Sequence, residues 1–111
     1  MTAGPALVTL SRRVEWESVG GGPLSVVRVG GEIDQDTAPL VALALARALD
    51  AHASVCCDLS EVTFFGAAGA HALLAAHRRA LETGRAFSLR GVHGVADRVM
   101  EALDPGQSIP R

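Results

Sequence analysis

The stretch Asp58–Gly69, DLSEVTFFGAAG, joins a short apolar run to an alanine-rich segment with helical periodicity. The run over Ser54–Leu59 has the length and composition of a buried strand. The segment Ala67–Thr83 follows it closely, with apolar residues at intervals of three and four. A buried strand leading into a helix is typical of α/β folds with parallel strands. The helix residues expected to face inward are Ala70, Leu73, Leu74, His77 and Leu81.

Two further strands are predicted before this unit. Leu7–Trp16 reads as a strand with an exposed end or a bend, and Val19–Pro23 combines three glycines with a proline, which indicates a turn. Leu24–Val29 supplies the second strand, which Gly30-Gly31 is expected to end. We therefore expect an N-terminal antiparallel hairpin.

The remaining elements alternate between helix and strand. Asp36 or Thr37, followed by Pro39, is a helix-start signal, because a side-chain oxygen can accept an end amide and proline is tolerated in the first turn. That helix is expected to end near His52, and Gly84 is expected to end the helix that begins at Ala67. A short strand over Ala86–Leu89 and a final helix reaching Leu103 complete the order.

The predicted fold class is α/β, with the hairpin followed by alternating helices and parallel strands in one mixed sheet. We expect a single domain over residues 7–103. Residues 1–6 and 104–111 are expected to be loose termini, with residues 61–66 forming the connection between the central strand and its helix.

Composition and charge exclude several classes of protein. The chain has 111 residues, of which 49% are hydrophobic and 20% charged, so it can form a modest core. A formal net charge of -2 gives no broad attraction for nucleic acid or an anionic membrane. The N-terminus lacks a signal-peptide pattern, and no apolar run approaches the roughly 20 residues that span a bilayer. We expect a cytoplasmic protein without direct membrane insertion.

No constellation of catalytic, metal-binding or cofactor-binding residues is present. Cys56 and Cys57 are adjacent in the buried strand, where they point to opposite faces, and are interpreted as structural thiols. His71 and His77 have no paired acid, nucleophile or ligand set. Gly30-Gly31 lacks the phosphate-binding GxxxxGK[ST] pattern. The sequence therefore predicts no catalytic site, no metal and no cofactor.

Several spaced blocks together resemble the STAS domain, and most closely its bacterial anti-sigma factor antagonists. The resemblance covers roughly Leu7–Leu103. The blocks are Gly31-Glu32-Ile33-Asp34, Thr37-Ala38-Pro39, Asp58-Leu59-Ser60-Glu61-Val62-Thr63-Phe64, and the Gly69 helix with Ala75-Ala76-His77-Arg78-Arg79-Ala80.

The resemblance implies a non-enzymatic binding module. Members of that family bind a serine-kinase anti-sigma factor, and phosphorylation of a serine switches them off. The family's helix start resembles Asp-Ser-Ser-Gly, whereas this chain has Gly66-Ala67-Ala68-Gly69, with Ala67 at the phosphoacceptor position. A methyl group has no oxygen to receive phosphate, so we expect insensitivity to phosphorylation there. The family places an acidic residue, here Asp34, near the switch position.

The expected partner is an anti-sigma factor or a related serine-kinase-like regulator. Three alternatives stay open. Ser60, Thr63 or Thr37 could be the phosphoacceptor instead, or the strand-to-helix junction could be only a packing joint. The domain could also be a scaffold or transporter-associated subunit that docks onto a sensor complex or transport ATPase. A homodimer is also left open. The residues expected to contact the partner are Asp34, Thr37, Ser60, Thr63, Gly66, Ala67, Ala68, Gly69 and His71.

Overall fold

The computed structural model describes residues 8–16 and 22–111 and has the predicted α/β architecture. Expectations for residues 1–6 and for the turn over 19–21 lie outside this range. In chain order the elements are strand β1 (Val8–Trp16), strand β2 (Pro23–Ile33), helix α1 (Ala38–Ala51), strand β3 (Ser54–Phe65), helix α2 (Ala67–Thr83), strand β4 (Ala86–Arg90) and helix α3 (Gly94–Leu103).

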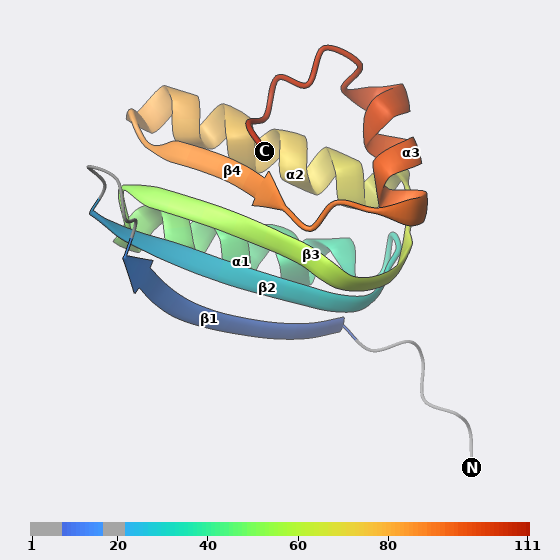
Figure 1. Cartoon of the computed structure of the whole chain (residues 1–111), viewed down its shortest axis with the longest axis horizontal. Coiled ribbons are helices and arrows are strands. Elements are labelled where there is room, and N and C mark those ends of the chain that lie inside the picture. Colours follow the sequence, from blue (N-terminus) through green and yellow to red (C-terminus); the bar gives the residue numbers. More distant parts are fainter. Residues whose placement is uncertain (1–7, 17–21) are drawn as a thin grey trace.

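The four strands form one mixed sheet in the order β1-β2-β3-β4. Strand β1 pairs antiparallel with β2, and the β2–β3 and β3–β4 pairs are parallel, which confirms the predicted topology. Helices α1 and α2 lie behind the sheet in Figure 1, and α3 lies at the end where β3 leads into α2. One face of the sheet therefore carries the two long helices, and residues 8–16 and 22–111 place no helix over the opposite face, called the open face below. None of the helices in the described part of the chain is both long and apolar enough to span a membrane.

The hydrophobic core lies between the sheet and the helices. Alternate residues of β3, Val55, Cys57 and Leu59, belong to this core, as expected for one face of a strand. Helix α2 contributes Leu73, Ala76 and Ala80 at helical intervals.

The inward stripe of α2 differs from the prediction at its C-terminal end. Leu81 was expected to face inward, but it is 68% exposed. The buried stripe runs through Ala80, and the next residue lies about 100° further around the helix. His77 and Leu74 are only partly buried, whereas Ala70 and Leu73 are buried as predicted. Gly84 ends the helix in the left-handed region, at φ 70°, as expected.

Strands β2 and β3 are longer than predicted. Residues 61–66 were expected to form a connection, but β3 continues to Phe65 because Ile33 and Phe65 are still paired. Gly30 and Gly31, expected to end β2, lie within it at irregularities in the β2–β3 register. A Cβ on Gly30 would lie 2.6 Å from Thr9 Oγ1, so glycine permits the close approach of β1 at this point.

The C-terminal segment is packed, contrary to the prediction that residues 104–111 are loose. Ile109 is only 1% exposed, and the Pro110 carbonyl accepts a hydrogen bond from the Leu89 amide at 2.8 Å. Asp104 folds the segment back, because its carboxylate accepts bonds from the Ser108 amide and hydroxyl at 3.1 and 2.8 Å. These local side-chain bonds fix a stretch that has no regular secondary structure.

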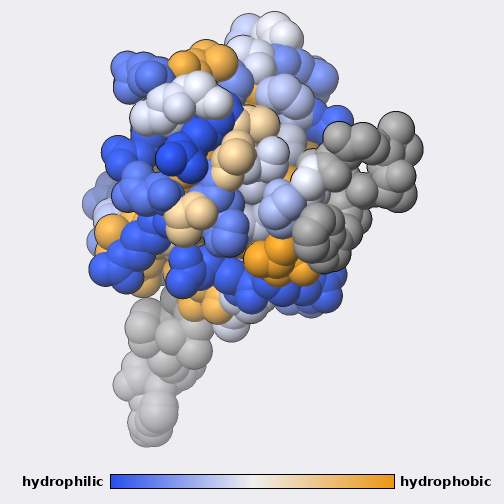
Figure 2. All heavy atoms as spheres, turned by 90° about the vertical axis from the view of Figure 1, so that its left-hand side faces the viewer, coloured by the Kyte–Doolittle hydropathy of each residue, from blue (hydrophilic) through white to orange (hydrophobic). Residues whose placement is uncertain are grey.

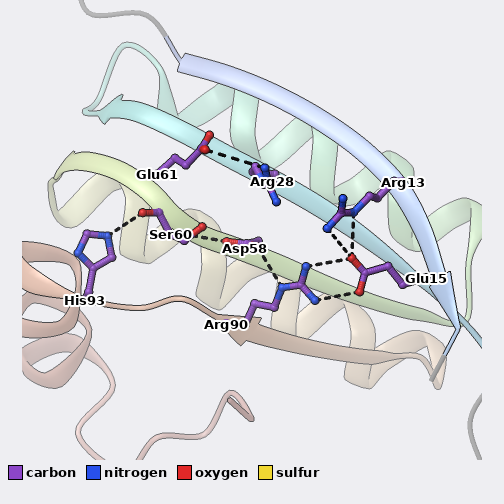
Figure 3. Close-up of polar contacts among 8 residues, drawn as sticks. All are labelled: Arg13, Glu15, Arg28, Asp58, Ser60, Glu61, Arg90 and His93. Atoms are coloured by element: carbon purple, nitrogen blue, oxygen red, sulfur yellow. Dashed lines mark hydrogen bonds and ion pairs between the residues drawn. The ribbon is translucent and has the colours of Figure 1, made fainter. Parts of the chain in front are cut away.

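A charged cluster on the open face of the sheet links β1, β3 and β4 (Figure 3). Arg90 Nη1 and Nη2 donate to the two carboxylate oxygens of Glu15 at 3.1 Å each, and Arg90 Nε donates to Asp58 Oδ2 at 3.0 Å. The Ser60 amide donates to the other Asp58 oxygen at 2.9 Å. Burial alone would raise the pKa of Asp58, but the hydrogen bonds from Ser60 and Arg90 and the charge of Arg90 lower this pKa to about 2.

Replacing Ile109 with alanine tests the packing of the C-terminal segment. Because the side chain is fully buried, Ile109→Ala should lower the free energy of unfolding by about 2–4 kcal/mol, measured by urea denaturation. The matched control Leu81→Ala removes an exposed side chain and should change this free energy by less than about 0.5 kcal/mol. Equal effects of the two variants would contradict the packed position of Ile109.

The lowered pKa of Asp58 predicts a loss of stability in acid. As pH falls, Asp58 of the unfolded chain, with a carboxyl pKa of about 3.9, binds a proton before Asp58 of the folded chain does. The contribution of Asp58 to the free energy of unfolding is therefore present above about pH 3.9 and is lost as pH falls toward 2. Between about pH 6 and about pH 3 this contribution should fall by about 1 kcal/mol. Urea denaturation of Asp58→Asn should show a shallower pH dependence by this amount, and an unchanged slope would refute the assignment.

Candidate partner-docking site

The candidate site lies where β2 and β3 end and where α1 and α2 begin, at the right-hand end of Figure 1. The Gly66 amide donates to the Ile33 carbonyl at 2.9 Å, so the last residue of β2 is tied to the residue that precedes α2. Parallel strands bring their carboxyl ends to the same edge of the sheet, which is where ligands and partners of such sheets bind.

Asp34 and Thr37 form a compact hydrogen-bonded turn before α1. Asp34 Oδ1 accepts bonds from the amides of Asp36 and Thr37 at 2.9 and 3.0 Å and from Thr37 Oγ1 at 3.1 Å. Thr37 Oγ1 accepts from the Asp34 amide at 2.9 Å. The bond from the Thr37 amide is the main cause of the lowered pKa of Asp34. Asp34 therefore stays ionised and is held in one orientation by its own loop.

This turn corrects the expected helix cap. Asp36 or Thr37 was predicted to accept an end amide of α1, but neither side chain does so. Asp34 accepts the amides of the residues that lead into the helix instead. An aspartate whose side chain bonds the backbone two and three residues ahead forms a local turn of this kind.

The start of α2 carries neither a hydroxyl nor an acidic side chain. Gly66 is the N-cap residue, and no side chain caps the helix. Ala67 is exposed, Ala68 is half-buried and Gly69 is buried. The first-turn residues therefore present methyl groups and backbone to the outside.

Gly69 has a packing role. A Cβ at this position would lie 2.8 Å from Phe65 Cε1 and 2.9 Å from Ile33 Cγ2. Both neighbouring side chains are fully buried and have little room to move. Glycine thus allows α2 to lie directly on the ends of β2 and β3, but its own position is inaccessible to a partner.

Two depressions lie near the start of α2. A groove of about 400 Å³ lies between the first halves of α1 and α2, and it includes His71 and Ala68 in its lining. A second depression, of about 380 Å³, lies between the end of β3 and the start of α3. Large apolar residues are partly exposed in the second depression, where Phe64 is 45% and Val95 47% exposed.

The structure separates Ser60 from the other predicted site residues. Ser60 and Thr63 were expected in a loop, but both lie in β3. Thr63 is exposed and lines the second depression. Ser60 bonds to Asp58 on the open face of the sheet, as Figure 3 shows, and its carbonyl lies 3.1 Å from His93 Nε2. The residues that gather around the start of α2 are therefore Asp34, Thr37, Thr63, Gly66, Ala67, Ala68 and His71.

Sequence reasoning missed Glu15, Arg90, His93 and Val95. Arg90 and Asp58 end up side by side because they are register partners in the parallel β3–β4 pair. An arginine after the last strand and an aspartate at the end of the neighbouring apolar run were visible signals. The pairing of Arg90 with Glu15 spans 75 positions and has no local signal.

The remaining chemistry-bearing residues form no second site in the described ranges. Cys56 and Cys57 are free and buried, and burial raises the pKa of both thiols. Within residues 8–16 and 22–111, no three histidine, cysteine, aspartate or glutamate residues are grouped as metal ligands would be. Figure 2 shows the end of the molecule opposite the candidate site, where hydrophilic residues dominate and the hydrophobic ones are scattered.

Comparisons with known proteins agree with this architecture. The family model described as "Mlab, STAS domain" matches residues 22–109. The crystal structure of an anti-sigma factor antagonist from Mycobacterium paratuberculosis is 33% identical in sequence, with a TM-score of 0.62, over 92% of this chain and 84% of that chain. No curated protein matches.

A second solved structure shows the same fold at lower identity. It is the anti-sigma factor antagonist SpoIIAA in its unphosphorylated form, which is 15% identical, with a TM-score of 0.66, over 89% of this chain and 85% of that chain. The family match spans most of the chain, including the elements that surround the start of α2. The chain therefore belongs to the STAS domain family.

Proposed function

We propose that this protein is an anti-sigma factor antagonist-like binding module whose docking is insensitive to phosphorylation at the start of α2. It acts by binding, without turnover, in the cytoplasm. Its partner is an anti-sigma factor or a related serine-kinase-like regulator. The observation that carries the proposal is the exposed Ala67 at the head of α2, in a chain that is 33% identical to a solved anti-sigma factor antagonist.

The chemistry of this helix start supports the insensitivity. Phosphoryl transfer needs a hydroxyl, and Ala67 and Ala68 have only methyl groups. A phosphate would add about two negative charges beside Asp34 and the partner, and the repulsion would disfavour docking. Since position 67 cannot acquire that charge, docking there has no such off state. The proposed contact surface comprises Asp34, Thr37, Thr63, Gly66, Ala67, Ala68 and His71. Gly69 is buried beneath the helix start, and Ser60 lies apart on the open face of the sheet.

A second candidate function is a scaffold or transporter-associated STAS subunit that docks onto a sensor complex or a transport ATPase. The absence of a phosphoacceptor at position 67 favours it, because a subunit held permanently in an assembly needs no release switch. The same surface would serve, since fold alone does not decide the partner. Capture of a transport ATPase instead of an anti-sigma kinase would select this second function.

Restoring the hydroxyl tests the missing acceptor. The wild type, Ala67→Ser and the control Ala75→Ser, which adds a serine at another exposed position of α2, are each incubated with purified anti-sigma kinases and ATP. Intact-mass measurement should show one added phosphate on Ala67→Ser alone. Phosphate on Ser60 or Thr63 of the wild type would disprove phosphorylation insensitivity.

A bulky charge at position 67 tests the docking surface. Ala67→Arg should weaken binding to the kinase by tenfold or more, because a long side chain separates surfaces that otherwise meet closely. A tenfold change in the dissociation constant corresponds to about 1.4 kcal/mol of binding free energy. Ala51→Arg is the control, since Ala51 is exposed at the opposite end of α1 and its replacement should leave the affinity unchanged. Calorimetric titration measures both, and equal affinities of the two variants would place docking elsewhere.

A further inference from the structure

The connection between β4 and α3 is only three residues long and is tightly fixed. Arg90 is the last residue of β4, and α3 begins at Gly94. Gly91 has a φ of 70°, and a Cβ there would lie 2.8 Å from the Ser60 amide nitrogen. Such a short, closely packed connection leaves little freedom between the end of the strand and the start of the helix.

Ser60 is the point at which this connection meets β3. Its amide donates to Asp58 Oδ1 at 2.9 Å, and its carbonyl lies 3.1 Å from His93 Nε2. Figure 3 shows His93, Ser60, Asp58 and Arg90 in a continuous row of contacts that reaches Glu15 and, through it, Arg13. The row therefore joins the first strand of the sheet to the residue that precedes α3.

The arginine in this row is held in a defined orientation. Three of its guanidinium nitrogens donate to carboxylates, two to Glu15 and one to Asp58, at 3.0–3.1 Å. The planar fork of arginine gives such contacts both strength and fixed direction. Asp58 is only 5% exposed, so its bonds to Arg90 and Ser60 are shielded from competing water.

The first turn of α3 lines the depression at the end of β3. Val95 and His93 belong to this lining together with Thr63 and Phe64. A shift of the β4–α3 connection would therefore change the shape of the depression without altering any of the β3 residues that line it.

We propose that Glu15, Arg90 and Asp58 form a charged clamp that positions the first turn of α3 and thereby shapes the docking surface. Its members are positioning residues, because they lie on the open sheet face and act through Ser60 and His93. The link to docking rests on the proposed function, whereas the positioning of α3 does not. The clamp makes partner affinity dependent on residues outside the contact surface.

Hydrogen exchange tests the positioning. In Arg90→Gln, the exchange rates of the amides of residues 91–96 should increase relative to the wild type, because a partly buried charged bond is lost. The factor of increase should be roughly ten times that of the core amides of α2. Glu15→Gln removes the negative charge from the outer pairs with Arg90 and Arg13 but leaves the bond between Arg90 and Asp58, so it should show a smaller effect in the same amides. Arg79→Gln is the control, because it breaks an ion pair of 2.7 Å on the helical layer and should leave residues 91–96 unchanged. If, in both clamp variants, the amides of residues 91–96 accelerate no more than the core amides of α2, the inference is overturned.

The same variants test the link to docking. Arg90→Gln should weaken binding to an anti-sigma kinase by roughly threefold to tenfold, with Arg79→Gln equal to the wild type. Faster exchange at residues 91–96 together with unchanged affinity would disprove the effect on docking. If the wild type binds no anti-sigma kinase, the proposed function fails, while the exchange result still decides whether the clamp positions α3.

Discussion

The contact of Gly69 with Phe65 and Ile33 is the constraint on which the rest of the structure depends. The absence of a side chain at Gly69 lets the first turn of α2 rest on two buried side chains from the ends of β2 and β3. The Ile33–Gly66 hydrogen bond fixes the same corner from the backbone. Ile33 is also the residue from which the chain leads into α1, so the same corner joins the start of α2 to the end of the strand that precedes α1.

Much of this architecture follows from patterns in the sequence. The buried strand before an alanine-rich helix and the Gly84 helix end correctly predicted a mixed sheet with alternating helices. The errors arose where pairing or packing overrode local signals. Gly30 and Gly31 serve close approach within a strand, and Ile109 is buried by long-range contacts. Likewise, Asp34 could be named as a candidate from the sequence, whereas the contacts among Glu15, Asp58 and Arg90 join distant strands and have no local signal.

The corner combines rigidity with a helix start whose side chains are all apolar. One oxygen of the Asp34 carboxylate, Oδ1, accepts two amides and one hydroxyl of its own turn, so the carboxylate is oriented before any partner arrives. The side chain of Ala67 adds neither charge nor hydrogen-bonding capacity, and Phe64 and Val95 expose apolar surface in the depression at the end of β3. A surface of this kind favours recognition by shape and apolar contact, with electrostatics confined to its edge.

The folded-back C-terminal segment also determines how the sheet ends. An unpaired edge strand can recruit another chain through its free backbone groups, and this is a common route to aggregation. At β4 the Leu89 amide is occupied by Pro110, and the buried Ile109 anchors the covering segment. At β1 the protection differs, because Arg12 and Arg13 place adjacent exposed charges along the outer strand. The two edges of one small sheet thus carry different features that disfavour edge-to-edge association, a covering segment at β4 and exposed charged side chains at β1.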